Sequence, residues 1–287
     1  MSDASDYKLT APLLLIFFLW GSDTVAIKFG LGMCPPLLLA GLRYLIGGAA
    51  LLLISAFRSH HFKPRDYVPF ALLGLISSVE FGCMYTGIQY LSAGLSAILY
   101  NTCPIWVALF AWPLLGETLN LKKVIGFAIG FLGVVFIFAT GLTVDHVNTE
   151  VLSGAVLLIL AALGYALVTI GFKKIPKNRD LLLGNGVLLL TSSFVLLPLS
   201  LSENFSICPD LKFISLLLFL ALVNSAFGIT VYFYILRRRE ASKVAPYIFL
   251  TPISTVILSI LLLGESLTLT NSIGMICICL GIYVVNK

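Results

Sequence analysis

The sequence predicts an all-α integral membrane protein in which ten transmembrane helices form two inverted five-helix repeats. Three observations support this fold class: the composition is strongly apolar, ten apolar stretches are each long enough to cross a bilayer, and the two halves of the chain contain a matching segment. A soluble domain usually carries roughly twice the proportion of charged residues found here.

The apolar stretches account for most of the chain. Hydrophobic residues make up 59% of the 287 residues and charged residues 11%, and the mean hydropathy is +1.05. A helix needs roughly 20 apolar residues to cross a hydrocarbon core about 30 Å thick. The stretches that meet this length are, in chain order, 10–31, 36–57, 67–90, 93–115, 121–140, 151–172, 181–201, 211–236, 244–263 and 269–286.

Basic residues indicate the orientation of these helices, because cytoplasmic loops carry an excess of Lys and Arg. With the N-terminus in the cytoplasm, 15 of the 18 basic residues fall on the cytoplasmic side, Lys212 falls outside, and Lys28 and Arg43 fall within helices. We therefore expect a multi-pass protein of the plasma membrane, the inner membrane of a bacterium, with both termini in the cytoplasm. The expected partners are the lipid bilayer and a small solute, and no nucleic acid.

An internal repeat divides the chain. A shift of 148 residues aligns PIWVALFAWPLLGETLNLKKVIGFAIGFLG with PISTVILSILLLGESLTLTNSIGMICICLG without a gap. We expect the repeat units to be residues 1–143, with the first five helices, and residues 144–287, with the other five. Because five is an odd number, the second unit must enter the membrane upside down relative to the first, as in many secondary transporters.

Two glutamates and two prolines recur at equivalent positions of the repeat. Glu117 and Glu265 fall just ahead of the fifth and tenth spans, where a carboxylate stabilises a helix N-terminus or binds loop amides. We expect a structural role for both. Pro104 and Pro252 fall inside spans, and each leaves a carbonyl group without its helical donor. Membrane helices tolerate such breaks best beside protein or water, so we expect a cavity next to these prolines.

The chain resembles the EamA type of ten-helix transporter within the drug/metabolite transporter superfamily. The resemblance is carried by WGSDTVAIKFGL in the first helix, PPLLLAGLRYLIGGAALLL in the second, and the two repeated segments that run from a proline to Gly-Glu. It implies a carrier with a central cavity between the halves, open alternately to either side, and often export of amino acids or related metabolites. Two features depart from the family pattern: Gly164-Tyr165 stands where a tryptophan is frequent, and Glu80 is unusual.

Four ionisable residues lie within the first three spans, namely Asp23, Lys28, Arg43 and Glu80. A charge in the hydrocarbon region is costly and usually faces a partner or a cavity. At 1.5 Å per residue, Asp23 and Arg43 lie at similar depths, so they are expected to meet. One interpretation is a structural ion pair; the other is that Arg43 binds a substrate carboxylate and Asp23 holds it. Lys28 is expected to extend to the surface.

Glu80 lies near mid-membrane, where no second basic residue is evident at the same depth. One hypothesis is that Glu80 couples proton movement to transport or pairs with an ammonium group on the solute. The competing interpretation is a protonated carboxyl group that is hydrogen-bonded to a neighbouring helix and has no role in transport.

Further candidates follow from the repeat and from the polar and aromatic residues of the spans. The shift of 148 residues pairs Glu80 with Gly228, so the expected site is asymmetric. The additional candidates for substrate binding are Trp20, Asn101, Asn224, Ser225, Tyr232 and Tyr247. For the aromatic residues and for Asn101, packing or an interhelical hydrogen bond is the alternative interpretation.

Together these features predict a secondary active transporter that works by alternating access. The expected solute is a small polar metabolite, an amino acid or related zwitterion, with export as the expected direction; an organic cation or a nucleoside-like metabolite is the alternative. A passive channel is disfavoured by the inverted repeat, and an intramembrane enzyme by the placement of His60, His61 and His146 in loops. No cofactor and no metal are expected. A homodimer and a disulfide between Cys34 and Cys208 stay open.

Overall fold

The computed structural model describes residues 3–57, 64–138, 149–203, 209–263 and 267–287. Within these residues the chain forms helices, and ten of the helical spans are long and apolar enough to cross a membrane. This agrees with the predicted fold class. The first half contains α1 (Asp3–Gly21), α2 (Asp23–Leu31), α3 (Pro36–Ala56), η1 (Pro64–Tyr67), α4 (Val68–Tyr90), α5 (Ala93–Tyr100), α6 (Cys103–Leu115) and α7 (Leu121–Phe138). The second half contains α8 (Thr149–Lys173), α9 (Leu181–Ser200), α10 (Leu211–Leu218), η3 (Phe219–Ile229), α11 (Thr230–Leu236), α12 (Ala241–Val244), η4 (Ala245–Phe249), α13 (Leu250–Leu263) and α14 (Leu269–Asn286).

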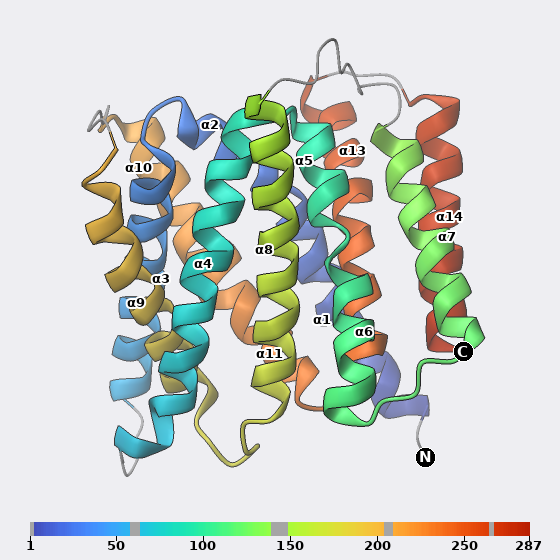
Figure 1. Ribbon diagram of the computed structural model, residues 1–287, viewed down its shortest axis with the longest axis horizontal. Coiled ribbons are helices and arrows are strands. Elements are labelled where there is room, and N and C mark those ends of the chain that lie inside the picture. The colour runs from blue at the N-terminus through green and yellow to red at the C-terminus, as the bar shows by residue number, and fades with distance from the viewer. Residues whose placement is uncertain (1–2, 58–63, 139–148, 204–208, 264–266) are drawn as a thin grey trace.

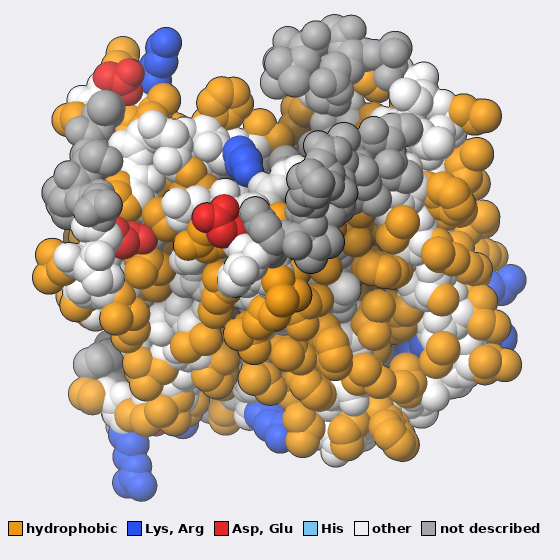
Figure 2. Space-filling model, turned by 45° about the horizontal axis from the view of Figure 1, so that its top comes forward, with side chains coloured by type: hydrophobic (Ala, Val, Ile, Leu, Met, Phe, Trp, Pro, Cys, Tyr) orange, Lys and Arg blue, Asp and Glu red, His pale blue; other side chains and the backbone are white. Residues whose placement is uncertain are grey.

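The helices stand side by side, and both chain termini lie at the same end of the bundle (Figure 1). We call this end the terminal side. Hydrophobic side chains cover most of the wall seen in Figure 2, and Lys and Arg side chains appear along its lower edge. Large apolar residues such as Phe29, Leu53 and Phe194 are more than half exposed, which suits a surface that faces lipid rather than water.

Several spans are interrupted within their length. In the first span α1 ends at Gly21 and α2 begins at Asp23, and in the fourth span α5 ends at Tyr100 and α6 begins at Cys103. The structure places Pro104 in the first turn of α6. Backbone N–H groups of the first turn have no acceptor within the helix, so a proline there removes no helical hydrogen bond. The ninth span changes from a 3-10 segment to α13 directly ahead of Pro252.

The eighth span contains an 11-residue π-helix, η3. Such segments are rare and often mark functional sites, because they turn side chains away from the positions that an α-helix would give them. All of the mid-span interruptions described here contribute residues to the cavity described below.

A close helix pair supports the predicted inversion of the repeat. Helices α7 and α14 are the last of their respective halves, and glycines lie at their contact. A Cβ atom on Gly126 would lie 2.9 Å from the carbonyl oxygen of Gly281, and one on Gly274 would lie 2.6 Å from that of Gly133. The shift of 148 residues converts the first contact into the second. Because early residues of α7 meet late residues of α14, these equivalent helices run in opposite directions.

Substitution of Gly133 by leucine should therefore destabilise the protein, because the new side chain meets the Gly274 backbone and Ile278 within 3 Å. We expect a loss of about 1–3 kcal/mol, seen as a lower melting temperature of the purified protein in detergent. Gly32→Ala is the control, since its Cβ atom has only one neighbour, at 3.4 Å. Equal melting temperatures for the two variants would contradict this packing.

Candidate functional site

A central cavity lies between the two halves of the chain, with about 1250 Å³ of empty space including the part open to solvent. Its lining includes most of the residues that the sequence predicted for the site: Trp20, Asp23, Arg43, Glu80, Asn101, Asn224, Tyr232 and Pro252. Tyr247 and Pro104 are buried in η4 and α6 and do not belong to this lining. The lining also includes tyrosines that the sequence analysis did not select as binding residues, Tyr44, Tyr100 and Tyr165.

An ion pair forms the most strongly bonded part of the cavity. Arg43 is 3% exposed, and its Nη1 atom lies 3.0 Å from Asp23. The same atom donates to the Tyr85 hydroxyl at 2.9 Å, and Nε donates to Ser225 Oγ at 2.7 Å. The remaining nitrogen, Nη2, makes no hydrogen bond to any described residue. The guanidinium group is thus fixed on two sides while one N–H edge is left for another acceptor.

The second half of the chain holds this ion pair through the π-helix η3. Asn224 Nδ2 donates to Asp23 Oδ1 at 2.8 Å, so Asn224 binds the acid while the adjacent Ser225 binds the base. The carbonyl oxygen of Asn224 accepts a hydrogen bond from Trp20 Nε1 at 3.0 Å. This approach requires a glycine at position 228, because a Cβ atom there would lie 2.6 Å from Trp20 Nε1. Trp20 therefore docks onto the eighth span as well as lining the cavity.

Glu80 lies apart from the ion pair and has a different environment. It is 3% exposed, and its one described hydrogen bond comes from the Tyr100 hydroxyl at 3.3 Å. Gly164 of α8 packs directly against it, since a Cβ atom on Gly164 would lie 2.8 Å from Glu80 Cβ. The unusual glutamate and Gly164 are thus parts of one contact. No basic residue in the described part of the chain forms an ion pair with Glu80.

Lys28 is exposed, which agrees with the expectation that its side chain extends to the surface. Its Nζ atom donates to the carbonyl oxygens of Ile88 at 3.0 Å and Leu91 at 2.5 Å. These groups lie at the end of α4, where the last carbonyls of a helix lack internal donors and attract a cation. Lys173 of α8 binds the carbonyl oxygens of Leu236 and Arg239 in the same manner at the end of α11.

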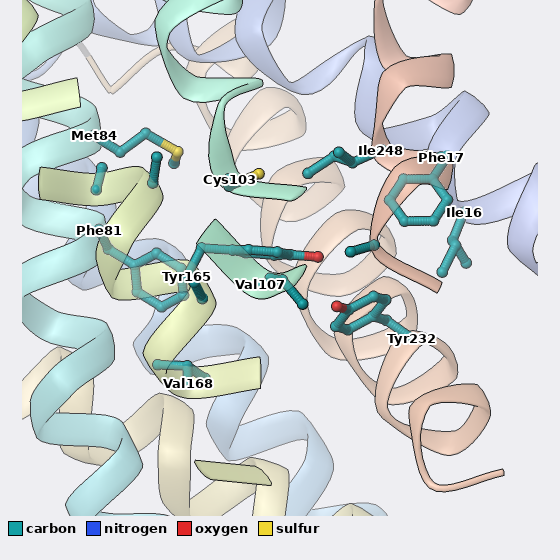
Figure 3. Close-up of a cluster of buried hydrophobic side chains, with 14 of the residues drawn as sticks. Ile16, Phe17, Phe81, Met84, Cys103, Val107, Tyr165, Val168, Tyr232 and Ile248 are labelled. Atoms are coloured by element: carbon teal, nitrogen blue, oxygen red, sulfur yellow. The ribbon is translucent and has the colours of Figure 1, made fainter. Parts of the chain in front are cut away.

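Two tyrosines, Tyr165 and Tyr232, line the part of the cavity nearer the terminal side. The hydroxyl groups of Tyr165 and Tyr232 point toward each other between α8 and α11, beside Val107 (Figure 3). Their ring centroids are 5.9 Å apart, and Tyr232 also shares a hydrogen bond of 3.3 Å with Thr169. Beyond this layer Phe172 is fully buried. Toward the opposite side, the lining reaches Phe138 at the end of α7.

Contacts between the two halves of the chain also lie at the terminal side. Glu117 accepts hydrogen bonds from the backbone N–H groups of Ala241 at 2.7 Å and Ser242 at 2.9 Å, and from Ser242 Oγ at 2.6 Å. Its carboxylate therefore caps the first turn of α12, in the other half of the chain, rather than α7 as its position in the sequence suggested. Glu265 lies outside the described residues. We call the contact of Glu117 with Ala241 and Ser242 the terminal-side gate.

An ion pair lies beside the terminal-side gate. Lys123 Nζ is 3.1 Å from Glu240 and donates to Ser242 Oγ at 2.8 Å. Partial burial opposes ionisation of Glu240, but Lys123 and Lys243 outweigh it and lower the pKa of Glu240 below its usual value. The pair therefore persists through neutral pH and weakens only in acid, as the pH falls through the lowered pKa.

Cys34 is buried between the first and second spans. Burial, and then the negative charge of Glu203, raise the pKa of Cys34 to about 12, so the group is a thiol rather than a thiolate at neutral pH. Cys208 lies outside the described residues, and a disulfide between the two cysteines remains a prediction.

Asp23→Asn should destabilise the protein, because it leaves the Arg43 guanidinium buried without its counter-charge. We expect a loss of roughly 3 kcal/mol, typical of breaking a buried pair, measured as a lower melting temperature in detergent. Glu240→Gln is the control: it removes an ion pair whose acid is 44% exposed and should cost less than about 1 kcal/mol. A melting temperature unchanged by Asp23→Asn would show that the ion pair does not stabilise the fold.

Comparison with known proteins identifies the architecture around this cavity. The sequence matches the EamA-like transporter family over residues 11–139 and again over residues 152–287. It is 34% identical to the transporter YvbV of Bacillus subtilis, over 97% of this chain and 92% of that protein. It is 30% identical to a probable amino-acid metabolite efflux pump of Salmonella typhimurium, over 94% of this chain and 92% of that protein. A crystal structure with 16% sequence identity superposes with a TM-score of 0.80 over 97% of this chain and 96% of the other, which shows the shared fold. The chain belongs to the EamA-like transporter family.

Proposed function

We propose that this transporter is a secondary carrier that moves an amino acid or related zwitterion by alternating access, with export as the direction. The observation that carries this proposal is the placement of two separate charged groups in one cavity. Arg43 offers a free Nη2 edge, and Glu80 lies elsewhere in the lining with Tyr100 as its described partner. A carboxylate at Arg43 and an ammonium group at Glu80 would satisfy both.

The shape of the cavity favours a carrier over a channel. Tyr165, Tyr232 and the terminal-side gate lie toward one side of the cavity, and the lining reaches the helix end at Phe138 on the other. Such a cavity represents one half of an alternating cycle, in which the two repeats rock around a site near the membrane midplane. The bias of basic residues assigns the terminal side to the cytoplasm, so this state faces outward across the plasma membrane.

The printed name of the Salmonella relative, an amino-acid metabolite efflux pump, supports both the solute class and the direction. An organic cation is the second candidate, because Glu80 is a carboxyl group without a described ion-pair partner. An organic cation would give Nη2 of Arg43 no acceptor. A zwitterion provides a partner for both Arg43 and Glu80, so we favour the zwitterion.

Counterflow in liposomes tests the carrier mechanism. Liposomes with the purified protein are preloaded with one amino acid and then diluted into a trace of the same labelled compound. A carrier exchanges the two, so labelled uptake should rise transiently above equilibrium and should saturate with concentration. Uptake that increases linearly with concentration and shows no overshoot would contradict the proposal.

Glu80→Gln tests proton coupling. We expect this variant to exchange the solute with a higher KM, because the amide lacks the charge that pairs with the ammonium group. We also expect net flux to lose its dependence on a pH gradient, because an amide cannot carry a proton across the cycle. Asp66→Asn is the control, since Asp66 pairs with Arg179 near the membrane surface, away from the cavity. If Glu80→Gln retains the pH dependence of the unmodified protein, Glu80 is not the coupling residue.

A further inference from the structure

Four aromatic side chains form a continuous strip in the lining of the cavity. The ring centroids are 6.3 Å apart for Tyr100 and Tyr165, 5.9 Å apart for Tyr165 and Tyr232, and 5.6 Å apart for Tyr232 and Trp20. All four residues line the cavity. They come from α5, α8, α11 and α1, so both halves of the chain contribute. We call these four residues the aromatic strip.

The aromatic strip connects the two charged parts of the cavity. At one end the Tyr100 hydroxyl donates to Glu80 at 3.3 Å. At the other end Trp20 Nε1 donates to the carbonyl oxygen of Asn224 at 3.0 Å, and the side chain of Asn224 donates to Asp23 of the ion pair. A solute that is held at either charged group therefore has an aromatic ring beside it.

The rings of the strip do not cover one another's faces. Tyr100 and Tyr165 meet edge to face, with an interplanar angle of 70°, and Tyr232 is tilted by 39° from Tyr165. Tyr44 and Phe81 in the same lining differ, because they are stacked with centroids 3.9 Å apart and an interplanar angle of 19°. Each of these two rings covers one face of the other, so the aromatic strip is the better surface for a further ring.

Three members of the strip are placed to contact a solute. Trp20 and Tyr100 are partly exposed, and Tyr165 is 8% exposed. Tyr232 is 1% exposed, and its ring packs against Phe17 with centroids 6.2 Å apart. Tyr232 therefore supports its neighbours from behind, and Tyr165 has a ring of the strip on either side.

The polar atoms of the lining offer few partners to a solute side chain. Five of them have no hydrogen-bond partner among the described residues, but each of these atoms is buried: Ser77 Oγ, Ser96 Oγ, Asn101 Oδ1, Tyr165 Oη and Asn224 Oδ1. The hydroxyl groups of Thr169, Thr251 and Thr255 are hydrogen-bonded to other protein groups, and Thr24 lies directly after Asp23 of the ion pair. Beyond the charged groups, the lining therefore favours an apolar part of the solute over a polar one.

We propose that the solute carries a flat aromatic side chain, which packs against the aromatic strip beside Tyr165. This inference rests on the proposed function and specifies the solute further. Aromatic rings prefer edge-to-face or offset contacts with centroids roughly 4.5–7 Å apart, and such pairs are more stable than the burial of their area alone explains. Neighbouring rings of the strip already lie at such separations. An aromatic side chain extends this arrangement, whereas an aliphatic side chain of the same size gains only from burial.

Matched solutes test this preference in liposomes with the unmodified protein. Counterflow is measured for each standard amino acid and for L-cyclohexylalanine, which has the carbon skeleton of phenylalanine but neither a planar ring nor π electrons. We expect the KM for phenylalanine to be roughly three- to tenfold below that for cyclohexylalanine, and the KM for alanine and serine to be higher than both.

Two results would contradict the proposal in different ways. Equal KM values for phenylalanine and cyclohexylalanine, or a lower KM for serine than for phenylalanine, would overturn the aromatic preference and leave the carrier intact. An absence of counterflow for every amino acid would overturn the proposed function as well.

Tyr165→Leu provides a second test, with Phe172→Leu as its control. Both changes remove a buried ring from α8, but Phe172 does not line the cavity. We expect Tyr165→Leu to raise the ratio of the KM for phenylalanine to the KM for alanine several-fold, and Phe172→Leu to leave this ratio unchanged. Tyr165→Phe should keep the preference, because the Tyr165 hydroxyl makes no hydrogen bond to a described residue. The same ratio in Tyr165→Leu as in Phe172→Leu would overturn the role of Tyr165.

Discussion

The site depends on the requirement that a charge within the membrane be compensated by protein. Arg43 meets this requirement through Asp23 from its own half and through Ser225 from the other half. Asn224 holds the acid in turn, so the ion pair couples the first two spans to the eighth. The structural and functional interpretations of this pair are therefore not exclusive: the contacts that compensate the charge also leave the Nη2 edge of Arg43 free for a solute.

The two halves of the chain each match the same family, but they place different chemistry at positions that the shift of 148 residues makes equivalent. Glu80 corresponds to Gly228, and the structure gives a steric reason for each residue: Glu80 packs against Gly164, whereas Gly228 admits Trp20. Ser225 binds Arg43, but its equivalent Ser77 has no described partner and faces the cavity. The chemistry of the cavity is thus asymmetric: Ser225 and Asn224 of the second half hold the ion pair, whereas Glu80 comes from the first half alone.

Much of this could be predicted from the sequence, because hydropathy and repeat alignment report on span length and on position within a span. The meeting of Asp23 with Arg43 followed from their equal depths. The π-helix η3 could not be predicted in this way, since apolarity does not specify the hydrogen-bond register of a membrane helix. The same holds for the carbonyl partners of Lys28 and for the capping of α12 by Glu117. These depend on which helix ends meet in space, which a single sequence does not encode as a local pattern.

Alternating access is the central claim, and a reversible cross-link across the terminal-side gate tests it most directly. Thr118 and Lys243 lie next to the residues that form this gate, on opposite halves of the chain. Both are changed to cysteine in a protein whose six native cysteines are replaced, and a flexible, cleavable thiol cross-linker is added to the liposomes. The account predicts that cross-linking stops counterflow, that cleavage restores it, and that neither single-cysteine variant is affected. Full counterflow with the gate cross-linked would contradict alternating access at this cavity.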